Sequence, residues 1–495
     1  MQLVVDGKRR DIAVPDGQTI LDVLRLEYGI TCPCGGNGRC GKCKVKVLEK
    51  ETDTQWKTVL SCMTADVFCA DATELIHSSS AQAKVQDSYS SDGLRFEKDC
   101  SWDGYSVAVD IGTTTLAMYL IDGNSAEVVD QRTALNPQST FGSDVISRIV
   151  YSSNDEKSKK QIQSVLASRL EQMINNLISG REGSVDCIQV VGNPTMIYLL
   201  AGLDAQELGV APYRISVKDP FSVMSDEIGM HMHVPVFFPG SVSAFFGSDI
   251  TCGMVATLDL GCEESFIYTD LGTNGEIAVS DGKRILCCST AAGPAFEGAN
   301  ISCGIGAVEG AICNVATNDG KFTVRTIGGG KPLGICGSGI IDLTAELIRN
   351  GYVDFTGRID DSIHQPIEVC DGVSFTQKDV REIQLAKSAI RAGIEVLMEM
   401  LGMGSERIDK VYISGGFGTY IDIRNCLEMG IFPDIEPSRF VSLGNAAGKG
   451  AVSMVHSKAF CSAVEGLRQS IGYVELFDSA SFQEKYVDCM MFGEE

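Results

Sequence analysis

The chain has 495 residues, a length that predicts about two or three domains rather than one hydrophobic core. Its formal net charge of −24 excludes nucleic acid as a partner class, because phosphate binding needs a basic surface. The longest apolar run, at residues 196–203, is shorter than the roughly 18 residues that cross a bilayer. The N-terminus lacks a basic segment followed by an apolar one, so we expect a cytoplasmic protein without a membrane span.

The 19 cysteines are spread along the chain, and only residues 32–43 hold a dense group of them. A long chain without a secretion signal is typical of a reducing compartment, so we expect most thiols to be free and to pack as small hydrophobes. The acidity is uneven, because residues 1–80 carry a net charge of −1 and residues 81–495 carry −23. The first 80 residues therefore differ from the rest in both cysteine density and charge.

Residues 1–80 are predicted to form a small α+β domain. Two short alternating runs flank Asp6–Gly7, a pair that is typical of a β-hairpin. Residues 18–29 have the apolar spacing of a short amphipathic helix, with Thr19 and Asp22 in capping-box positions. A cysteine-rich loop and a further strand follow. This order of hairpin, helix and cysteine loop matches that of a ferredoxin.

The cysteine loop has the spacing of an iron–sulfur site. Cys34, Cys40 and Cys43 form a C-x5-C-x2-C pattern, and Cys62 follows at a distance. Plant-type [2Fe–2S] proteins bind their cluster with four thiolates in a similar C-x4-C-x2-C pattern and a distant fourth cysteine. The glycines between the cysteines suit a loop that passes close to anionic sulfurs. We therefore predict a [2Fe–2S] cluster with these four cysteines as its metal ligands.

Two alternatives to this ligand set remain open. The four cysteines of the loop, with Cys32 in place of Cys62, would also supply four thiolates to zinc. Their spacing differs from the paired C-x2-C of zinc knuckles, and zinc would leave the ferredoxin-like order of elements unexplained. The second alternative is that Cys32 or Cys69 replaces one of the expected cluster ligands.

Residues 81–104 are rich in serine and charge and lack a hydrophobic period, so we predict a flexible linker. The sequence then changes to strands, glycine turns and long helices. A strand–turn–strand unit at residues 105–122 recurs at residues 264–282. The recurrence predicts an internally duplicated α/β fold with two lobes, at about residues 105–255 and about 256–495.

Both units place an aspartate and a Gly-Thr turn after their first strand, as DIGTTT from Asp110 and as DLGTNG from Asp270. Such turns offer N–H groups and hydroxyls to phosphate oxygens. An aspartate at a strand end can hold Mg²⁺ directly or through water. We therefore predict Asp110 and Asp270 as catalytic Mg²⁺ ligands. The expected phosphate-binding residues are Gly112, Thr113, Thr114, Gly272, Thr273 and Asn274.

A third glycine motif, SGGFG, begins at Ser414 after a predicted strand. Two phosphate turns followed by a glycine pair resemble the sugar kinase, Hsp70 and actin superfamily (ASKHA). The resemblance implies a two-lobed α/β fold in which Gly415 and Gly416 lie near adenosine. Gly337 and Ser338 precede an apolar helix and are a further candidate anion site. The glycine motifs of P-loop and Rossmann proteins are absent from the sequence.

Three further carboxylates are candidates for the nucleotide site. Glu297 is a candidate for positioning the attacking water, with a structural role at a helix start as the alternative. Asp249 and Glu276 are weaker candidates. The two histidines of the HMH segment at residues 231–233 have no third ligand nearby in the sequence, so we do not predict a metal site there.

Over nearly its whole length the chain resembles the reductive activators of corrinoid proteins, which serve methyltransferase systems of anaerobic bacteria and archaea. The resemblance implies a β-grasp [2Fe–2S] ferredoxin domain at residues 1–80, a linker at 81–104 and an ASKHA ATPase at 105–495. Besides the cysteine loop and the glycine turns, the stretches that carry it are residues 191–213, 289–307, 334–354, 376–397 and 412–422.

The resemblance implies ATP-dependent, one-electron reduction of a partner's Co(II) corrinoid to Co(I), with electrons passing through the [2Fe–2S] cluster. The implied cofactors are this cluster, ATP and Mg²⁺. The implied partners are a corrinoid-binding methyltransferase protein, a low-potential electron donor (ferredoxin, flavodoxin or a reductase) and a second copy of the chain in a homodimer. The alternative is an electron-transfer or redox-sensing protein whose ASKHA fold is a docking scaffold without ATPase activity.

Overall fold

The computed structural model describes residues 1–493 with internal exceptions. The exceptions are residues 6, 13, 15–17, 29–42, 74–95, 97, 100, 143, 319 and 419. The predicted ligands Cys34 and Cys40 therefore lie outside the described residues, as do Cys32 and most of the expected linker. Within the described part of the chain, no helix combines the length and the hydropathy needed to cross a membrane.

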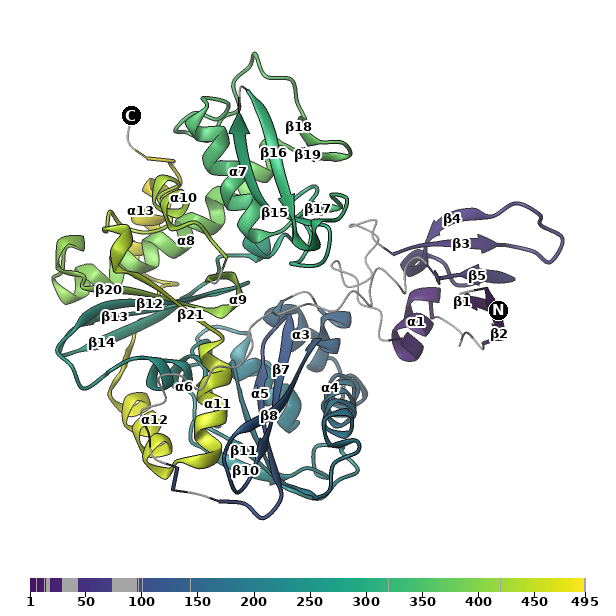
Figure 1. Ribbon diagram of the computed structural model, residues 1–495, viewed down its shortest axis with the longest axis horizontal. Coiled ribbons are helices and arrows are strands. Elements are labelled where there is room, and N and C mark those ends of the chain that lie inside the picture. Colours follow the sequence, from purple (N-terminus) through teal and green to yellow (C-terminus); the bar gives the residue numbers. More distant parts are fainter. Residues whose placement is uncertain are drawn as a thin grey trace.

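The N-terminal domain is a mixed five-stranded sheet with helix α1 packed against it (Figure 1). Its elements are β1 (Gln2–Val5), β2 (Lys8–Asp11), α1 (Ile20–Tyr28), β3 (Lys44–Leu48), β4 (Lys57–Leu60), η1 (Ser61–Met63) and β5 (Cys69–Asp71). Strands β1 and β2 form the predicted hairpin, and β5 lies between β1 and β3. The predicted capping box opens α1, because Asp22 Oδ2 accepts a hydrogen bond from the Thr19 N–H at 2.8 Å. The ferredoxin-like fold is confirmed.

Lobe one is built on a six-stranded sheet in the order β10-β11-β9-β6-β7-β8. Its elements are β6 (Tyr105–Ile111), β7 (Thr115–Asp122), β8 (Val128–Leu135), η2 (Pro137–Thr140), α3 (Val145–Ser152), α4 (Glu156–Ile178), β9 (Val185–Gly192), α5 (Pro194–Ala201), η3 (Gln206–Leu208), β10 (Phe221–Met224), β11 (Pro235–Phe238) and α6 (Ser248–Thr257). Helix α4 packs its apolar residues, among them Leu166 and Leu170, on β7 and β8.

Lobe two has a second six-stranded sheet, in the order β21-β20-β12-β13-β14-β22, and two small sheets, β16-β15-β17 and β18-β19. Its longest helix, α8 (Gln377–Leu401), begins with a capping box formed by Thr376 and Asp379. Its elements are β12 (Ser265–Leu271), β13 (Gly275–Asp281), β14 (Ile285–Thr290), η4 (Pro294–Glu297), β15 (Ala311–Asn318), β16 (Lys321–Thr326), η5 (Ile327–Gly329), β17 (Gly334–Ile335), α7 (Gly337–Arg349), β18 (Ile367–Cys370), β19 (Val373–Phe375), α8 (Gln377–Leu401), η6 (Ser405–Arg407), β20 (Lys410–Ser414), α9 (Gly415–Gly418), α10 (Ile423–Glu428), η7 (Pro437–Arg439), β21 (Phe440–Gly444), α11 (Ala446–His456), α12 (Lys458–Ser470), β22 (Gly472–Tyr473) and α13 (Ala480–Asp488).

The two lobes repeat one topology. In lobe one, β6, β7 and β8 form an antiparallel meander, and β9 and β11 add in parallel beside β6. In lobe two, β12, β13 and β14 form the same meander, and β20 and β21 add in parallel beside β12. Asp110 and Asp270 therefore lie at equivalent places, one residue before the end of the first strand. The predicted duplication of the α/β fold is confirmed.

Helices α6 and α11 lie between the two sheets, as Figure 1 shows. They pack closely because glycines stand at the contact. A Cβ added at Gly450 of α11 would come within 2.6 Å of the Cys252 backbone on α6. Buried side chains of both sheets, such as Val191 of β9 and Tyr268 of β12, complete this central core. The helix pair α6 and α11 therefore joins the two lobes.

Residues 96–104, which the sequence assigned to the flexible linker, contain several residues that pack on the C-terminal helices. The Phe96 ring lies edge-on to Phe460 of α12, with 5.1 Å between centroids. Trp102 Nε1 donates a hydrogen bond to the Val455 carbonyl of α11 at 3.2 Å. Asp99 Oδ1 accepts one from the backbone N–H at the start of α12 at 2.8 Å. These described residues belong structurally to the two-lobed body.

Candidate functional site

Two of the predicted cluster ligands meet at one end of the N-terminal domain. Cys43 lies directly before β3 and Cys62 lies in η1, directly after β4. The antiparallel pairing of β3 with β4 and a 2.8 Å hydrogen bond from Ser61 N–H to the Cys43 carbonyl bring them together. Their sulfurs are 3.1 Å apart, and the residues are 0% and 7% exposed. A disulfide would need about 2.05 Å, so these two sulfurs are not bonded to each other.

This thiol pair fits a [2Fe–2S] cluster, because two ligands of one metal centre must place their sulfurs next to each other. The assignment of the other two ligands, Cys34 and Cys40, stays a prediction. Cys69 lies in β5, opposite Leu48 of β3, where it is fully buried and burial raises the pKa of its thiol. A raised thiol pKa disfavours the thiolate that metal binding needs.

The first phosphate turn is held from three sides. The Gly112 N–H donates to the Thr115 carbonyl at 2.9 Å, which closes the turn between β6 and β7. The buried Asn136 donates its amide to the Gly112 carbonyl at 2.8 Å. Asn193, the N-cap of α5, donates to the Thr113 hydroxyl at 3.2 Å. The turn is therefore a fixed loop rather than a free hairpin end. The second turn repeats the closure, with the Gly272 N–H donating to the Asn274 carbonyl at 3.0 Å.

Asp110 and Asp270 are each oriented by one donor from a neighbouring element. Asn445, the N-cap of α11, donates to Asp110 Oδ2 at 3.0 Å. Ser414, the last residue of β20, donates to Asp270 Oδ2 at 2.9 Å. Burial raises the pKa of Asp110 to about 7, and the negative charge of Asp270 contributes. Burial raises the pKa of Asp270 as well.

Two more carboxylates share this electrostatic environment. Burial and the charges of Asp110 and Asp270 raise the pKa of Asp249, at the start of α6, to about 8. Burial and the charges of Asp249 and Asp270 raise the pKa of Glu276 of β13 strongly. Among the described residues, no three His, Cys, Asp or Glu side chains converge closely enough to hold a metal ion directly. A hydrated Mg²⁺ fits this arrangement, because Mg²⁺ keeps several of its waters.

Glu297 lies between the two phosphate turns. Its Oε2 accepts hydrogen bonds from the Thr273 hydroxyl at 2.9 Å and from the Thr114 hydroxyl at 3.3 Å. Burial raises the pKa of Glu297, whereas the two hydroxyls and the charge of Arg148 oppose that rise. The turns of the two lobes therefore lie next to one another, and this carboxylate joins them. We refer to the candidate nucleotide site that these two turns border as the cleft.

Arg148 of α3 provides the buried positive charge at this cleft. It is 1% exposed, and its Nε donates to the Gly142 carbonyl at 2.9 Å. Burial lowers the pKa of Arg148 to about 10, against the opposing effects of Asp144 and Glu297. The guanidinium is charged at neutral pH and favours anions in the cleft.

Gly415 lies beside Asp270 at the end of β20. Its φ of +84° is in the left-handed region, and an added Cβ would lie 2.8 Å from Asp270 Oδ1. Only glycine meets both conditions. Gly416 follows in α9. The other candidate, Gly337 and Ser338, forms the first turn of α7 rather than a loop before it, and the Ser338 hydroxyl donates to the Cys313 carbonyl at 2.9 Å.

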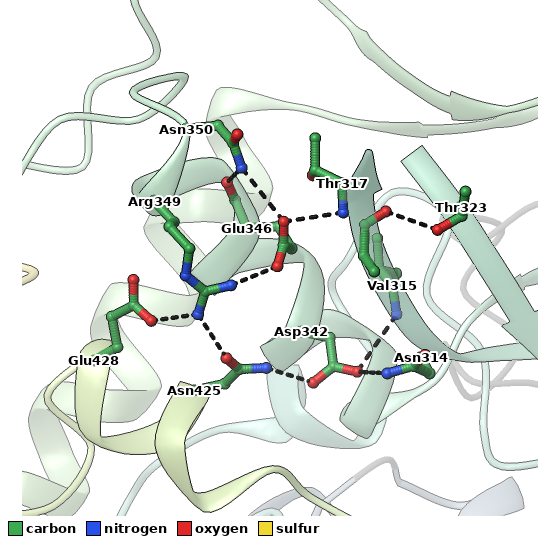
Figure 2. A network of polar contacts seen from close by, with 11 residues as sticks. Asn314, Val315, Thr317, Thr323, Asp342, Glu346, Arg349, Asn350, Asn425 and Glu428 are labelled. Atoms are coloured by element: carbon green, nitrogen blue, oxygen red, sulfur yellow. Dashed lines mark hydrogen bonds and ion pairs between the residues drawn. The ribbon is translucent and has the colours of Figure 1, made fainter. Parts of the chain in front are cut away.

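A polar network ties α7 to β15 and α10 (Figure 2). Asp342, 4% exposed, accepts hydrogen bonds from Asn314 Nδ2 at 2.7 Å and from Asn425 Nδ2 at 2.8 Å. Arg349 donates to Asn425 Oδ1 at 2.9 Å and also pairs with two glutamates. Burial raises the pKa of Asp342, and the hydrogen bonds that it accepts from Asn425 and Asn314 limit this rise. The network holds α10, which follows the SGGFG segment, against α7.

The histidines of the HMH segment pair with carboxylates on the surface. His231 Nδ1 lies 2.8 Å from Glu171 Oε2, and this partner raises the pKa of His231. His233 Nδ1 lies 3.0 Å from Asp226 Oδ1. Each histidine therefore has a carboxylate partner of its own.

Sequence reasoning missed the residues that orient the site. These residues, which contact or face the predicted ones, are Asn445, Ser414, Asn193 and Arg148. Asn445 and Asn193 had one available signal, because asparagine before an apolar helical run is a typical N-cap. Ser414 is the first residue of the SGGFG motif, but only the glycines of that motif were predicted to contribute to the site. Arg148 had no signal in the sequence.

Comparison with protein families assigns each part of the chain. Residues 3–65 match the 2Fe-2S iron-sulfur cluster binding domain, which supports a [2Fe–2S] cluster. Residues 105–260 match the RACo middle region. Residues 264–495 match the C-terminal domain of RACo, the ASKHA domain, which supports nucleotide binding.

Individual relatives agree with this assignment. The corrinoid activation enzyme RamQ of Eubacterium limosum is 33% identical over 427 residues, which cover 79% of this chain and 70% of the relative. The Co(II) methylated amine-specific corrinoid protein reductase of Methanosarcina barkeri is 25% identical over 379 residues, covering 69% and 68%. The solved structure of a reductive activator for corrinoid, iron-sulfur protein aligns with a TM-score of 0.72 at 25% identity, covering 99% of this chain and 98% of that one. The chain therefore belongs to the RACo family, with a 2Fe-2S domain, a middle region and an ASKHA domain in that order.

Proposed function

We propose that this protein is an ATP-dependent reductive activator, which returns a partner's Co(II) corrinoid to Co(I) by transfer of one electron. Its relatives are named for corrinoid activation and Co(II) corrinoid protein reduction. The structural observation that carries the proposal is Glu297, which accepts hydrogen bonds from Thr114 and Thr273 and so brings the phosphate turns of both lobes to one cleft. One chain therefore combines a nucleotide cleft with a thiol pair suited to an iron–sulfur cluster.

The N-terminal domain supplies the electron-transfer part. A bound [2Fe–2S] cluster passes single electrons, at a potential near −400 mV in plant-type ferredoxins. Cys43 and Cys62 would bind its iron as thiolates, together with the predicted ligands Cys34 and Cys40. The domain packs the first pair into its core, at 0% and 7% exposure, which keeps water from two of the four ligands.

The two lobes supply the ATP-dependent part. Asp110 and Asp270 would hold a hydrated Mg²⁺, the two Gly-Thr turns would bind phosphate oxygens, and Gly415 and Gly416 would contact the adenosine. Asn445 and Ser414 keep the two carboxylates aimed into the cleft. Nucleotide that contacts both lobes favours one lobe arrangement over another, and this difference is available to bias a bound partner.

ATP is needed because the electron moves against a potential difference. Each 59 mV by which a one-electron step runs uphill lowers its equilibrium constant about tenfold. A conformational change in the partner that raises the cobalt potential, or that traps Co(I), removes this penalty. We also infer a low-potential donor to the cluster (ferredoxin, flavodoxin or a reductase) and a homodimeric assembly, as the family resemblance implies.

The test uses the purified protein, a corrinoid-binding methyltransferase protein from the same organism and a chemical reductant. Formation of Co(I) is followed by visible absorption with and without ATP. We expect Co(I) only when ATP is present. Cys43→Ser is expected to lose the EPR signal of the reduced cluster and Co(I) formation together, whereas Cys69→Ser retains both.

A second variant separates the two parts of the proposal. Asp270→Asn is expected to keep the cluster signal but to lose ATP hydrolysis and Co(I) formation at least about 100-fold. The exposed Glu182→Ala serves as the control. Equal Co(I) formation without ATP, together with normal reduction by Asp270→Asn, would instead support an electron carrier with a non-hydrolysing scaffold.

A further inference from the structure

The Glu297 carboxylate uses the hydroxyls that the phosphate turns offer. Its Oε2 accepts from Thr273 in lobe two at 2.9 Å and from Thr114 in lobe one at 3.3 Å. Its Oε1 lies against the second turn, because a Cβ added at Gly272 would come within 3.3 Å of that oxygen. One carboxylate oxygen thus bridges Thr114 and Thr273, which are 159 positions apart in the chain and lie in different lobes.

A hydroxyl carries one hydrogen, so each threonine can donate to only one acceptor at a time. While both donate to Glu297, neither can donate to a phosphate oxygen. Carboxylate and phosphate oxygens are the same kind of anionic acceptor, and both favour charge-assisted hydrogen bonds. The positive charge of Arg148 favours an anion here of either kind.

We propose that Glu297 is an internal stand-in for a nucleotide phosphate, which holds the two phosphate turns together when nucleotide is absent and must leave when ATP binds. The inference deepens the proposed function, because it rests on ATP binding in this cleft. It assigns to Glu297 a role in gating the site, in place of the water-positioning role expected from the sequence.

The exchange follows from charge. A phosphate that enters the cleft meets the carboxylate at the same donors, and two anions at one place repel each other. The carboxylate therefore turns away as phosphate takes over Thr114 and Thr273. Before nucleotide binds, only the form in which Glu297 has turned away can accept its phosphate. The observed affinity for nucleotide is therefore the affinity of that form multiplied by the fraction of protein that adopts it.

The experiment compares equilibrium binding of ATP, ADP and adenosine, with Mg²⁺, to the full-length protein and to Glu297→Ala. Glu297→Ala removes the two hydrogen bonds that the carboxylate accepts from Thr114 and Thr273. We therefore expect Kd to fall roughly tenfold or more for a nucleotide whose phosphate contacts both turns. Adenosine has no phosphate, so its affinity should not change. If the affinity rises for ATP alone, Glu297 takes the place of the terminal phosphate of ATP. If the affinity rises for both ATP and ADP, Glu297 takes the place of a phosphate that the two nucleotides share. Glu182→Ala is the matched control.

Hydrogen exchange adds a readout that does not depend on nucleotide affinity. Without nucleotide, the amides of residues 112–115 and 272–275 should exchange faster in Glu297→Ala than in the wild type, and ATP should restore their protection. Glu297→Gln, which keeps the side-chain shape, should give smaller changes in the same directions and guards against a folding defect. If the wild type binds ATP and Glu297→Ala binds it equally or more weakly, the stand-in role is wrong. If the wild type binds no nucleotide, the proposed function itself fails.

Discussion

Four buried carboxylates share one electrostatic environment, and holding them together is a cost that the folded chain carries. Burial raises the pKa values of Asp110, Asp249, Asp270 and Glu276, and for Asp110, Asp249 and Glu276 the charge of a neighbouring carboxylate adds to the rise. A site of this kind is unfavourable for folding alone and favourable for binding a cation. Repulsion at this point is what the proposed Mg²⁺–nucleotide site would show.

The pH dependence of stability tests this reading. The pKa values of about 7 for Asp110 and about 8 for Asp249 lie above the ordinary value of 3.8. Between about pH 4 and pH 8 the folded state therefore binds more protons than the unfolded state, so the free energy of unfolding falls as pH rises through this window. Asp249→Asn removes one of these groups. It should raise Tm by roughly 2–5 °C at pH 8 and by less than about 1 °C at pH 5.

Thermal unfolding without Mg²⁺ at the two pH values measures this effect. The exposed Asp478→Asn is the control and should leave the pH dependence of Tm unchanged. Equal Tm shifts for Asp249→Asn at pH 5 and pH 8 would mean that Asp249 ionises like an exposed carboxylate, and the shared electrostatic site would be wrong.

At the scale of elements, the contact between α6 and α11 decides how the lobes are joined. The two helices approach closely because Gly450 of α11 faces Cys252, and Gly253 of α6 faces Ala446. A Cβ at Gly253 would lie 3.0 Å from the Tyr268 hydroxyl. Strand β12 of the second sheet, which carries Tyr268, therefore packs on the same pair of helices. A nucleotide that moves one lobe relative to the other must be accommodated at this helix pair.

Gly450→Ala should destabilise the two-lobed body. Its new Cβ would meet the backbone and side chain of Cys252 at 2.6 Å, and overpacking of this kind costs about 1–3 kcal/mol, partly offset by about 1 kcal/mol of helix propensity. Gly466→Ala in α12 is the matched control, because nothing lies within 4 Å of its Cβ. It should gain about 0.5–1 kcal/mol. Calorimetric melting of both variants measures the difference, and equal Tm values would contradict close packing of α6 on α11.

Local sequence patterns predicted the elements well, because the signals for a strand, a turn or a cap lie within a few residues. The Thr19–Asp22 capping box and both strand–turn–strand units are examples. Local patterns could not predict the hydrogen bonds that orient the carboxylates of the candidate site. Asn445 reaches Asp110 across 335 positions, and Thr114 reaches Glu297 across 183. Pairs so distant are brought together only by the stacking of two sheets on α6 and α11.

At the scale of the whole molecule, the attachment of the ferredoxin domain depends on where the two-lobed body begins. The sequence placed that beginning at residue 105, after a linker of residues 81–104. Phe96, Asp99 and Trp102 nevertheless contact α11 and α12. Residues 81–104 are rich in serine and in charged residues, and this composition indicated a linker. The packing of its C-terminal part depends instead on three side chains that are separated in the sequence. The predicted linker is correspondingly shorter.

Two fragments test where the body begins. A fragment of residues 96–495 keeps the contacts of Phe96, Asp99 and Trp102, and its Tm should match that of the corresponding transition in the full-length protein. A fragment of residues 105–495 loses them all and exposes the apolar surface of Phe460, so its Tm should fall by roughly 5 °C or more. Trp102→Ala in the full-length chain should reproduce part of that fall, which separates lost contacts from effects of truncation. Identical melting of the two fragments would return residues 96–104 to the linker, and would lengthen the tether by which the ferredoxin domain reaches a partner held by the lobes.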